Sequence, residues 1–514
     1  MPGKRSRQGC DECRRRRRKC DEQKPTCAQC SAFGRTCHYT LKLVWGGRRF
    51  KKSCFGQCLQ LDTASAETIG TNGLRAPDYS LVSDAEDGGF VYGTKGVSEA
   101  HVLPHPAPLP SCLPNGVPLP PRYQRLLNYF TEDILASLSC HPSIHSDLCR
   151  GLVPVALDSP HLLSACLALS AAGFLSRGIS GVDGIDISRV LGHLQTSGLS
   201  LLRSALGSGQ MSETLLATCL IWCLADVFAC RQGVSSWRIH LQGIKALIDG
   251  NQTYQNFGAG SGVAQKAMRH LYLLYLSLQT LPYVPSPEAP RASALRSITP
   301  PREQKEPPAA ISPSIDGFLG YSEELLHVLQ QIDQISHDGD HRDGSSPPAP
   351  AADILLGKVK GMIHRDSHAP PEIAISSSLS TEHGRDFSLC HRTFQQATLV
   401  HLYRRLYRLP SGSAPIQAAV REIEAMVSEM TQGQPCRTWV AMAMPLFTIG
   451  CEAFTPGQRS FVLDKVDKFE ACLGSLHVGI IRQALEDMWE ARAALGDMDG
   501  EVCASRLLAD GNHE

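Results

Sequence analysis

The sequence lacks a hydrophobic run long enough to cross a membrane. Its longest apolar stretch, LLATCLIWCLADVFAC at 215–230, contains Asp226 and is shorter than the ~18 residues that a spanning helix needs. Residues 1–9 are basic and polar, without the apolar segment of a signal peptide. We therefore expect a soluble intracellular protein with no membrane partner.

Motifs of the common hydrolases and phosphate-binding enzymes are also missing. The sequence contains neither G-x-S-x-G nor H-E-x-x-H, the patterns of nucleophile elbows and zinc proteases. The glycine-rich stretch GAGSG at 258–262 is not followed by the lysine that a phosphate loop requires. We predict that the chain is not an enzyme.

The chain has no formal net charge, but its basic and acidic residues are distributed unevenly along the sequence. The chain has 50 Lys and Arg against 50 Asp and Glu, yet residues 1–52 contain 16 of the basic residues and only four of the acidic ones. The remainder therefore has 34 basic and 46 acidic residues. A cationic segment ahead of an acidic body predicts a polyanionic partner for that segment alone.

Six of the 20 cysteines lie within 28 residues, with the spacing C-x2-C-x6-C-x6-C-x2-C-x6-C. In a reducing compartment such a set indicates metal binding instead of disulfides. Six thiolates cannot fill two separate tetrahedral sites, so two zinc ions require two bridging sulfurs, and Cys10 and Cys27 are the symmetric choice. The predicted ligands are Cys10, Cys13, Cys20, Cys27, Cys30 and Cys37.

Six cations stand in a row inside the first half of this pattern: Arg14, Arg15, Arg16, Arg17, Arg18 and Lys19. On a helix, like charges three and four residues apart repel by about 0.2 to 0.5 kcal/mol per pair. Six thiolates with two Zn²⁺ have a formal charge of −2, which offsets part of this repulsion. We expect the remaining positive charge to contact DNA, with nuclear import as a second use.

The rest of the chain predicts a mainly α fold. We expect a zinc module with a basic tail at 1–52, a disordered linker at 53–121 and a large all-helical regulatory domain at 122–514. Disordered insertions are predicted at about 282–318 and 337–352, where Pro, Ser and charge accumulate. Apolar residues recur at helical spacing over 122–138, 161–175, 187–206, 212–228, 235–248, 321–335, 387–409, 416–430, 436–454, 460–474 and 480–495. We find no alternating strand pattern of useful length.

Three segments of the chain resemble two known families. CDECRRRRRKCDEQKPTCAQC, residues 10–30, resembles the Zn2Cys6 binuclear cluster of fungal transcription factors. Residues 215–248 and 449–469 resemble the helical fungal-specific transcription factor domain. The resemblance implies two Zn²⁺ per chain and a first helix that enters the major groove of double-stranded DNA at a CGG triplet, with Arg17 at the base-reading position. Position 18 is usually apolar in the family and is arginine here.

The resemblance implies a nuclear, sequence-specific regulator of RNA polymerase II genes. We expect it to control one secondary-metabolite biosynthesis gene cluster; the alternative is regulation of nutrient catabolism, of amino acids or carbon sources. An enzyme with a zinc-cluster targeting module is a rival of another class. No heptad follows the cluster, so we expect either a monomer on one triplet or a homodimer through the helical domain. That domain is also expected to bind a co-regulator or a metabolite.

Overall fold

The computed structural model describes residues 10–16, 20–21, 23, 26–37, 119–182, 184–207, 212–229, 237–250, 262–280, 313–340, 349–375, 378–432 and 437–496. The chain divides into two compact units, residues 1–91 and 92–514, and each is considered by itself. The described part of the first unit contains two short helices, α1 (Asp11–Arg15) and α2 (Ala28–Ala32).

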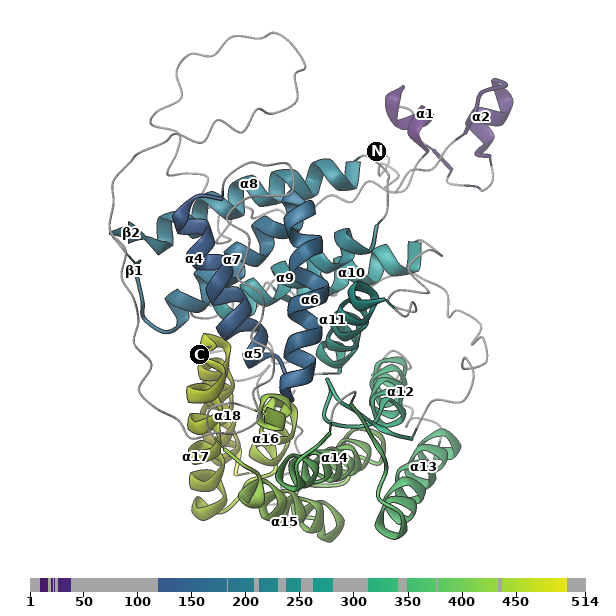
Figure 1. Ribbon diagram of the computed structural model, residues 1–514. Coiled ribbons are helices and arrows are strands. Elements are labelled where there is room, and N and C mark those ends of the chain that lie inside the picture. The colour runs from purple at the N-terminus through teal and green to yellow at the C-terminus, as the bar shows by residue number, and fades with distance from the viewer. Residues whose placement is uncertain are drawn as a thin grey trace. The chain divides into compact units, whose positions relative to one another are not determined.

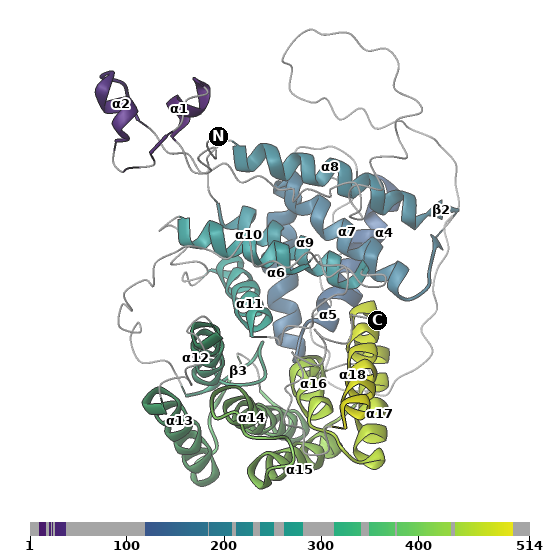
Figure 2. The ribbon, with the colours of Figure 1, turned by 180° about the vertical axis from the view of Figure 1, so that it is seen from behind.

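The second unit is an array of helices (Figures 1 and 2). Its first half contains α4 (Pro121–Tyr129), the π-helical turn η2 (Phe130–Ile134), α5 (Leu135–Ser137), α6 (Pro142–Asp158), α7 (Pro160–Ser176), β1 (Gly181–Val182), β2 (Ile185–Asp186), α8 (Ile187–Gly207), α9 (Glu213–Ala229), α10 (Trp237–Gly250) and α11 (Val263–Gln279).

The second half contains β3 (Ile315–Asp316), α12 (Glu323–Asp340), α13 (Ala349–His368), β4 (Ile373–Ala374), α14 (Thr381–His401), the π-helical turn η5 (Leu402–Leu406), α15 (Ala414–Glu429), the 3-10 turn η6 (Arg437–Ala441), α16 (Ala443–Cys451), α17 (Pro456–Leu473) and α18 (Leu476–Leu495).

Helices α7 and α9 form the centre of the first half because both are apolar around most of their circumference. Eleven residues of α7, from Leu162 to Gly173, are buried, as are most residues of α9, including Trp222. Helices α4, α6 and α8 pack against α7, and α10 packs against α9. Gly198 of α8 allows a close approach, because a Cβ there would lie 2.7 Å from the Trp222 ring.

Helix α14 has the corresponding place in the second half, with α12, α13, α15 and α16 packed around it. Helices α17 and α18 form an antiparallel hairpin beside α16, and α18 also contacts α9. The ends of α17 are fixed by local chemistry: Thr455 and Gln458 form a capping box at its start. Gly474 ends it with φ of 66°, a left-handed conformation that glycine adopts without strain.

The mainly helical fold is confirmed, and one of its predicted starts is clear: Ser212 Oγ accepts from the amide of Leu215 at the beginning of α9. Three helices were not predicted: α6, α11 and α13. Helix α6 contains Pro154 in its interior, and α13 begins in the Pro- and Ala-rich stretch whose composition predicts disorder.

Several predicted boundaries are wrong by a few residues. Leu119 packs into the core and Pro120 is the N-cap of α4, so the helical domain begins before residue 122. Most of the predicted linker at 53–121 lies outside the described residues. The predicted disordered insertions, at about 282–318 and 337–352, include residues that are folded. Residues 313–318 include strand β3 and the buried Phe318. Helix α12 continues to Asp340, and helix α13 begins at Ala349. Residues 281–312 and 341–348 lie outside the described part.

The prediction of no strands also needs correction. Strands β1 and β2 pair antiparallel, and β3 and β4 pair in parallel with Ile315 opposite Ile373. Each strand has two residues, which is too short to produce an alternating pattern. Among the described helices, none is both long and apolar enough to cross a membrane.

Candidate zinc centre and nucleic-acid interface

The six predicted cysteines converge in the first unit. Their sulfurs fall into two groups of four, each with all members within 4.8 Å of one another: Cys10, Cys13, Cys20 and Cys27 in one, and Cys10, Cys27, Cys30 and Cys37 in the other. Both groups contain Cys10 and Cys27. Six sulfurs thus provide two four-sulfur sites, which is the arrangement that two bridging thiolates require.

The sulfur separations fit zinc. Cys10 Sγ lies 3.7 Å from Cys27 Sγ and 3.6 Å from Cys30 Sγ, and Cys13 Sγ lies 3.7 Å from Cys27 Sγ. A tetrahedron with Zn–S bonds of about 2.3 Å has sulfur–sulfur edges of about 3.8 Å. The donor set and its dimensions therefore match two tetrahedral Zn²⁺ sites.

The two halves of the cluster repeat the same local structure 17 residues apart. The amides of Cys13 and Cys30 donate to Cys10 Sγ and Cys27 Sγ, at 3.4 and 3.3 Å, where α1 and α2 begin. The amides of Cys10 and Cys27 donate to the sulfurs of Cys20 and Cys37, at 3.4 and 3.3 Å. These hydrogen bonds orient the thiolates and stabilise their negative charge.

Hydrogen bonds to two carboxylates stabilise this small unit. Both oxygens of Asp21 accept from the amide of Ala28 at 3.1 Å, at the start of α2. Glu12 of α1 accepts from Arg15 Nε and Nη2, at 3.0 and 2.9 Å, and from Arg35 Nη1 at 2.9 Å. These contacts lower the pKa of Glu12 to about 2, with the Arg15 hydrogen bonds as the larger cause.

The surroundings shift the pKa values of four of the six thiols. Burial raises the pKa of Cys13 to about 12 and also raises the pKa of Cys10 and Cys30. The pKa of Cys37 is lowered, chiefly because its sulfur accepts from the Cys27 amide. Sulfurs that are protonated in a cation-free pocket must release protons when zinc binds, so metal affinity and pH are linked.

The predicted DNA-contacting run lies only partly within the described residues. Arg14 and Arg15 belong to α1, Arg15 and Arg16 are exposed, and the Arg16 amide continues the helix by donating to Glu12 O at 3.1 Å. Arg17, Arg18 and Lys19 lie outside the described part, as does the side chain of Arg14. At least two members of the run therefore face solvent on or just after the first helix.

Sequence analysis missed Glu12 and its two arginine partners as structural elements of the cluster. The spacing of Glu12 and Arg15 could have indicated the first contact, because residues three apart are neighbours on a helix. The contact of Glu12 with Arg35 is formed by the tertiary fold and leaves no local signal. Cys166, Cys219 and Cys223 are buried among apolar residues of the helical unit.

A binuclear cysteine cluster beside exposed arginines, together with a large helical unit, defines a class of metal-dependent DNA-binding regulators. Comparison with known proteins agrees. The fungal Zn(2)-Cys(6) binuclear cluster domain matches residues 8–45, and the fungal specific transcription factor domain matches residues 125–504. The chain therefore belongs to the fungal Zn2Cys6 transcription factors with this helical domain, and its six-cysteine cluster holds two Zn²⁺. Neither matching family is an enzyme family.

One curated relative is similar over a short part of the chain. The chain is 64% identical over 36 residues to the lysine biosynthesis regulatory protein LYS14 of Saccharomyces cerevisiae, a match that covers 7% of this chain and 5% of that protein. The similarity is thus confined to a small part of both proteins. No solved structure matches the chain.

Proposed function

We propose that the protein recognises CGG-type triplets in promoters of RNA polymerase II genes through the cations of its first half-cluster. The observation that carries the proposal is that both four-sulfur groups share Cys10 and Cys27, which lie on either side of the Arg14–Lys19 run in the sequence. In this proposal Cys10 and Cys27 bridge the two zinc ions. The rigid cluster then presents the run to the major groove.

The six cations divide their roles. Arg17 reads the triplet, because a guanidinium can donate two hydrogen bonds to O6 and N7 of guanine. Arg14, Arg15, Arg16, Arg18 and Lys19 contact phosphates or offset the charge of the cluster. A binding titration of the purified, zinc-loaded protein on CGG sites and single-base variants tests the proposal; equal affinity for all of them would refute it.

We further propose that the protein acts in the nucleus, either as a monomer on one triplet or as a homodimer joined through its helical unit. Light scattering of the full chain, alone and with a one-triplet DNA, decides between these states. A dimer that persists when the cluster cysteines are replaced would place the contact in the helical unit.

For the pathway, we propose control of one secondary-metabolite gene cluster, in keeping with the layout of one zinc module and one helical domain. The similarity to the lysine biosynthesis regulator covers only 36 residues, 7% of this chain, so it leaves the pathway open. Transcript profiling after deletion of the gene provides the test. Loss of transcripts from neighbouring biosynthetic genes supports the proposal, whereas changes confined to amino-acid or carbon catabolism favour the alternative.

A further inference from the structure

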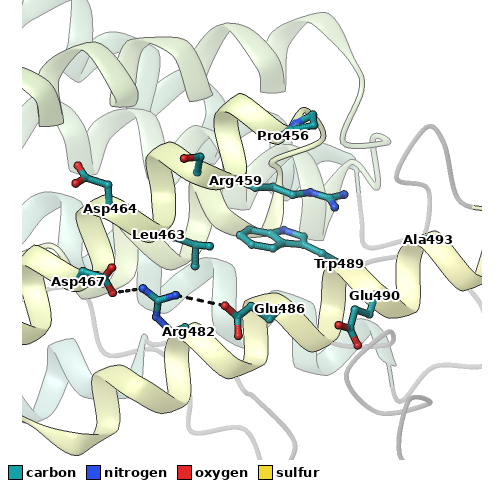
Figure 3. A pocket seen from close by; sticks show the side chains of 11 residues that line it. Pro456, Arg459, Leu463, Asp464, Asp467, Arg482, Glu486, Trp489, Glu490 and Ala493 are labelled. Atoms are coloured by element: carbon teal, nitrogen blue, oxygen red, sulfur yellow. Dashed lines mark hydrogen bonds and ion pairs between the residues drawn. The ribbon is translucent and has the colours of Figure 1, made fainter.

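A surface cleft of about 750 Å³ lies along the α17–α18 hairpin, away from any residue used above (Figure 3). Apolar side chains from both helices contribute to it, among them Leu463 and Trp489. Trp489 is largely buried, and its indole N–H donates to Gly450 O at 2.9 Å. The ring is therefore a fixed part of the cleft wall.

Most charged groups that line the cleft have an ionic partner. Arg482 of α18 pairs with Asp467 of α17 and with Glu486, the latter at 3.3 Å. Asp464 pairs with Lys468 at 2.8 Å. The contact of Arg482 with Asp467 joins α17 to α18, and these pairs leave few charged groups of the lining without a partner.

Two charges in the lining remain without an ionic partner. Arg459 lies over the Trp489 ring, 5.3 Å from its centroid, and its Nε makes a long contact of 3.5 Å with Ala453 O. Within the described part of the chain, neither Arg459 nor Glu490 has an oppositely charged group within 4.0 Å. Figure 3 shows them on opposite sides of Trp489. The cleft therefore has one cation and one anion without an ionic partner, separated by an apolar wall.

We propose that this cleft binds a small zwitterion with an apolar body, the chemistry shared by apolar amino acids and their short peptides. The free Nη atoms of Arg459 receive the carboxylate, since the guanidinium fork matches its two oxygens. Glu490 receives the ammonium group, and the apolar body lies along Leu463 and Trp489. The stacking of Arg459 on Trp489 holds the fork in position before binding.

The two charges without an ionic partner favour a zwitterion over a simple anion or cation. A carboxylate alone pairs with Arg459 and leaves Glu490 unused, and an amine alone pairs with Glu490 and leaves Arg459 unused. Glu490 is exposed and Arg459 is half-buried, so the preference comes from the second charge-assisted contact that only a zwitterion makes. The volume of the cleft lies within the usual range of small-molecule sites, about 300 to 1,000 Å³.

Calorimetric titration of the full-length, zinc-loaded protein tests the proposal with two probes, L-leucine and the dipeptide leucyl-leucine. Comparison of the two probes distinguishes a free amino acid from a short peptide as the ligand. Each probe is compared with its N-acetyl form, which lacks the ammonium, and its amide, which lacks the carboxylate. We expect one of the two zwitterions to bind saturably and each single-charge analogue to bind about tenfold more weakly or worse, as for loss of a charge-assisted hydrogen bond.

Two variants assign the ends of the ligand. Arg459→Gln should remove the difference in affinity between the zwitterion and its amide. Glu490→Gln should remove the difference in affinity between the zwitterion and its N-acetyl form. The matched controls are Arg421→Gln on α15 and Asp487→Asn on α18, both exposed and outside the cleft. They should bind like the unchanged protein.

The proposal is overturned if neither zwitterion binds, if the analogues bind equally well, or if the control variants weaken binding as much as the cleft variants. Unchanged circular dichroism and unfolding midpoints of the variants separate lost contacts from lost folding. The titration contains no DNA, so its outcome is independent of the triplet recognition proposed above.

Discussion

Arg35 Nη1 donates a hydrogen bond to Glu12 Oε1 over 2.9 Å and thereby links residues 23 positions apart in the zinc module. Glu12 lies on α1, in the half that holds the arginine run, whereas Arg35 follows α2. The contact therefore joins the two halves of the cluster independently of the metal. Arg15 binds the same carboxylate but lies on α1 together with Glu12, so its contact does not link the two halves of the cluster.

Arg35→Ala should accelerate the loss of zinc to a chelator, because it removes the protein contact between the halves. Arg15→Ala is the matched control, since it also removes a guanidinium from Glu12 yet leaves the cross-link intact. A colorimetric zinc indicator measures both rates. Equal zinc release from the two variants would show that the link between Glu12 and Arg35 does not stabilise the cluster. Neither variant should change the preference for CGG.

Metal removal should affect the two units differently. A fold held by few apolar residues depends on its metal, whereas the helical unit has an extensive apolar core. We expect two zinc ions per chain by metal analysis, and loss of DNA binding on chelation with nearly unchanged helical circular dichroism. A single zinc ion per chain, or a collapse of the helical signal on chelation, would contradict this division.

The geometry of the cluster could be predicted from sequence because the spacing of the cysteines fixes it. Cys10 and Cys27 begin identical C-x2-C-x6-C halves, and the structure repeats the same amide-to-sulfur bonds in both. Most of the long helices, with the exception of α6, α11 and α13, were predictable for a similar reason, since their apolar residues recur at helical spacing.

The remaining features depend on contacts that local patterns do not encode. Helix α6 accommodates Pro154 because packing against α7 and α11 compensates for the broken hydrogen bond. The pairing of Ile315 with Ile373 joins two-residue strands that are far apart in the sequence. Likewise, Arg459 and Glu490 share a cleft only because α17 and α18 fold into a hairpin.

His270 should make the stability of the helical unit depend on pH. It is buried and stacked on Phe318, with ring centroids 5.1 Å apart, and its ring nitrogens have no hydrogen-bond partner among the described residues. Burial is the main cause that lowers its pKa from 6.5 to about 4, while the charges of Asp147, Arg269 and Lys266 contribute less. The unfolded chain therefore binds this proton more readily than the folded chain.

Stability should consequently fall as the pH drops from about 6.5 towards about 4, by up to about 1.4 kcal/mol per pH unit for one proton. His270→Phe should flatten this decline and leave neutral-pH stability unchanged or higher, because it removes two buried polar atoms. Urea unfolding at several pH values measures the slope, with the same substitution at exposed His193 as the control. An unchanged slope in His270→Phe would refute the assignment.

Arg18 should contribute through phosphate contact alone. Arg18→Ala should weaken binding to every DNA sequence alike, and the slope of log affinity against log salt should decrease by roughly one. Titrations at several salt concentrations on a CGG site and on unrelated DNA provide the comparison. A selective loss on the CGG site would instead assign base reading to Arg18.

The central claim is that the zinc cluster positions Arg17 to read a CGG triplet. The most direct measurement is a fluorescence anisotropy titration of full-length protein and its Arg17→Ala variant on CGG and its single-base variants, with and without zinc. We predict that the unchanged protein discriminates by ~1 to 3 kcal/mol at the guanine read by Arg17, and that this discrimination disappears in Arg17→Ala and after zinc removal. If Arg17→Ala retained the full preference for CGG, or if the metal-free protein did, the account would be wrong.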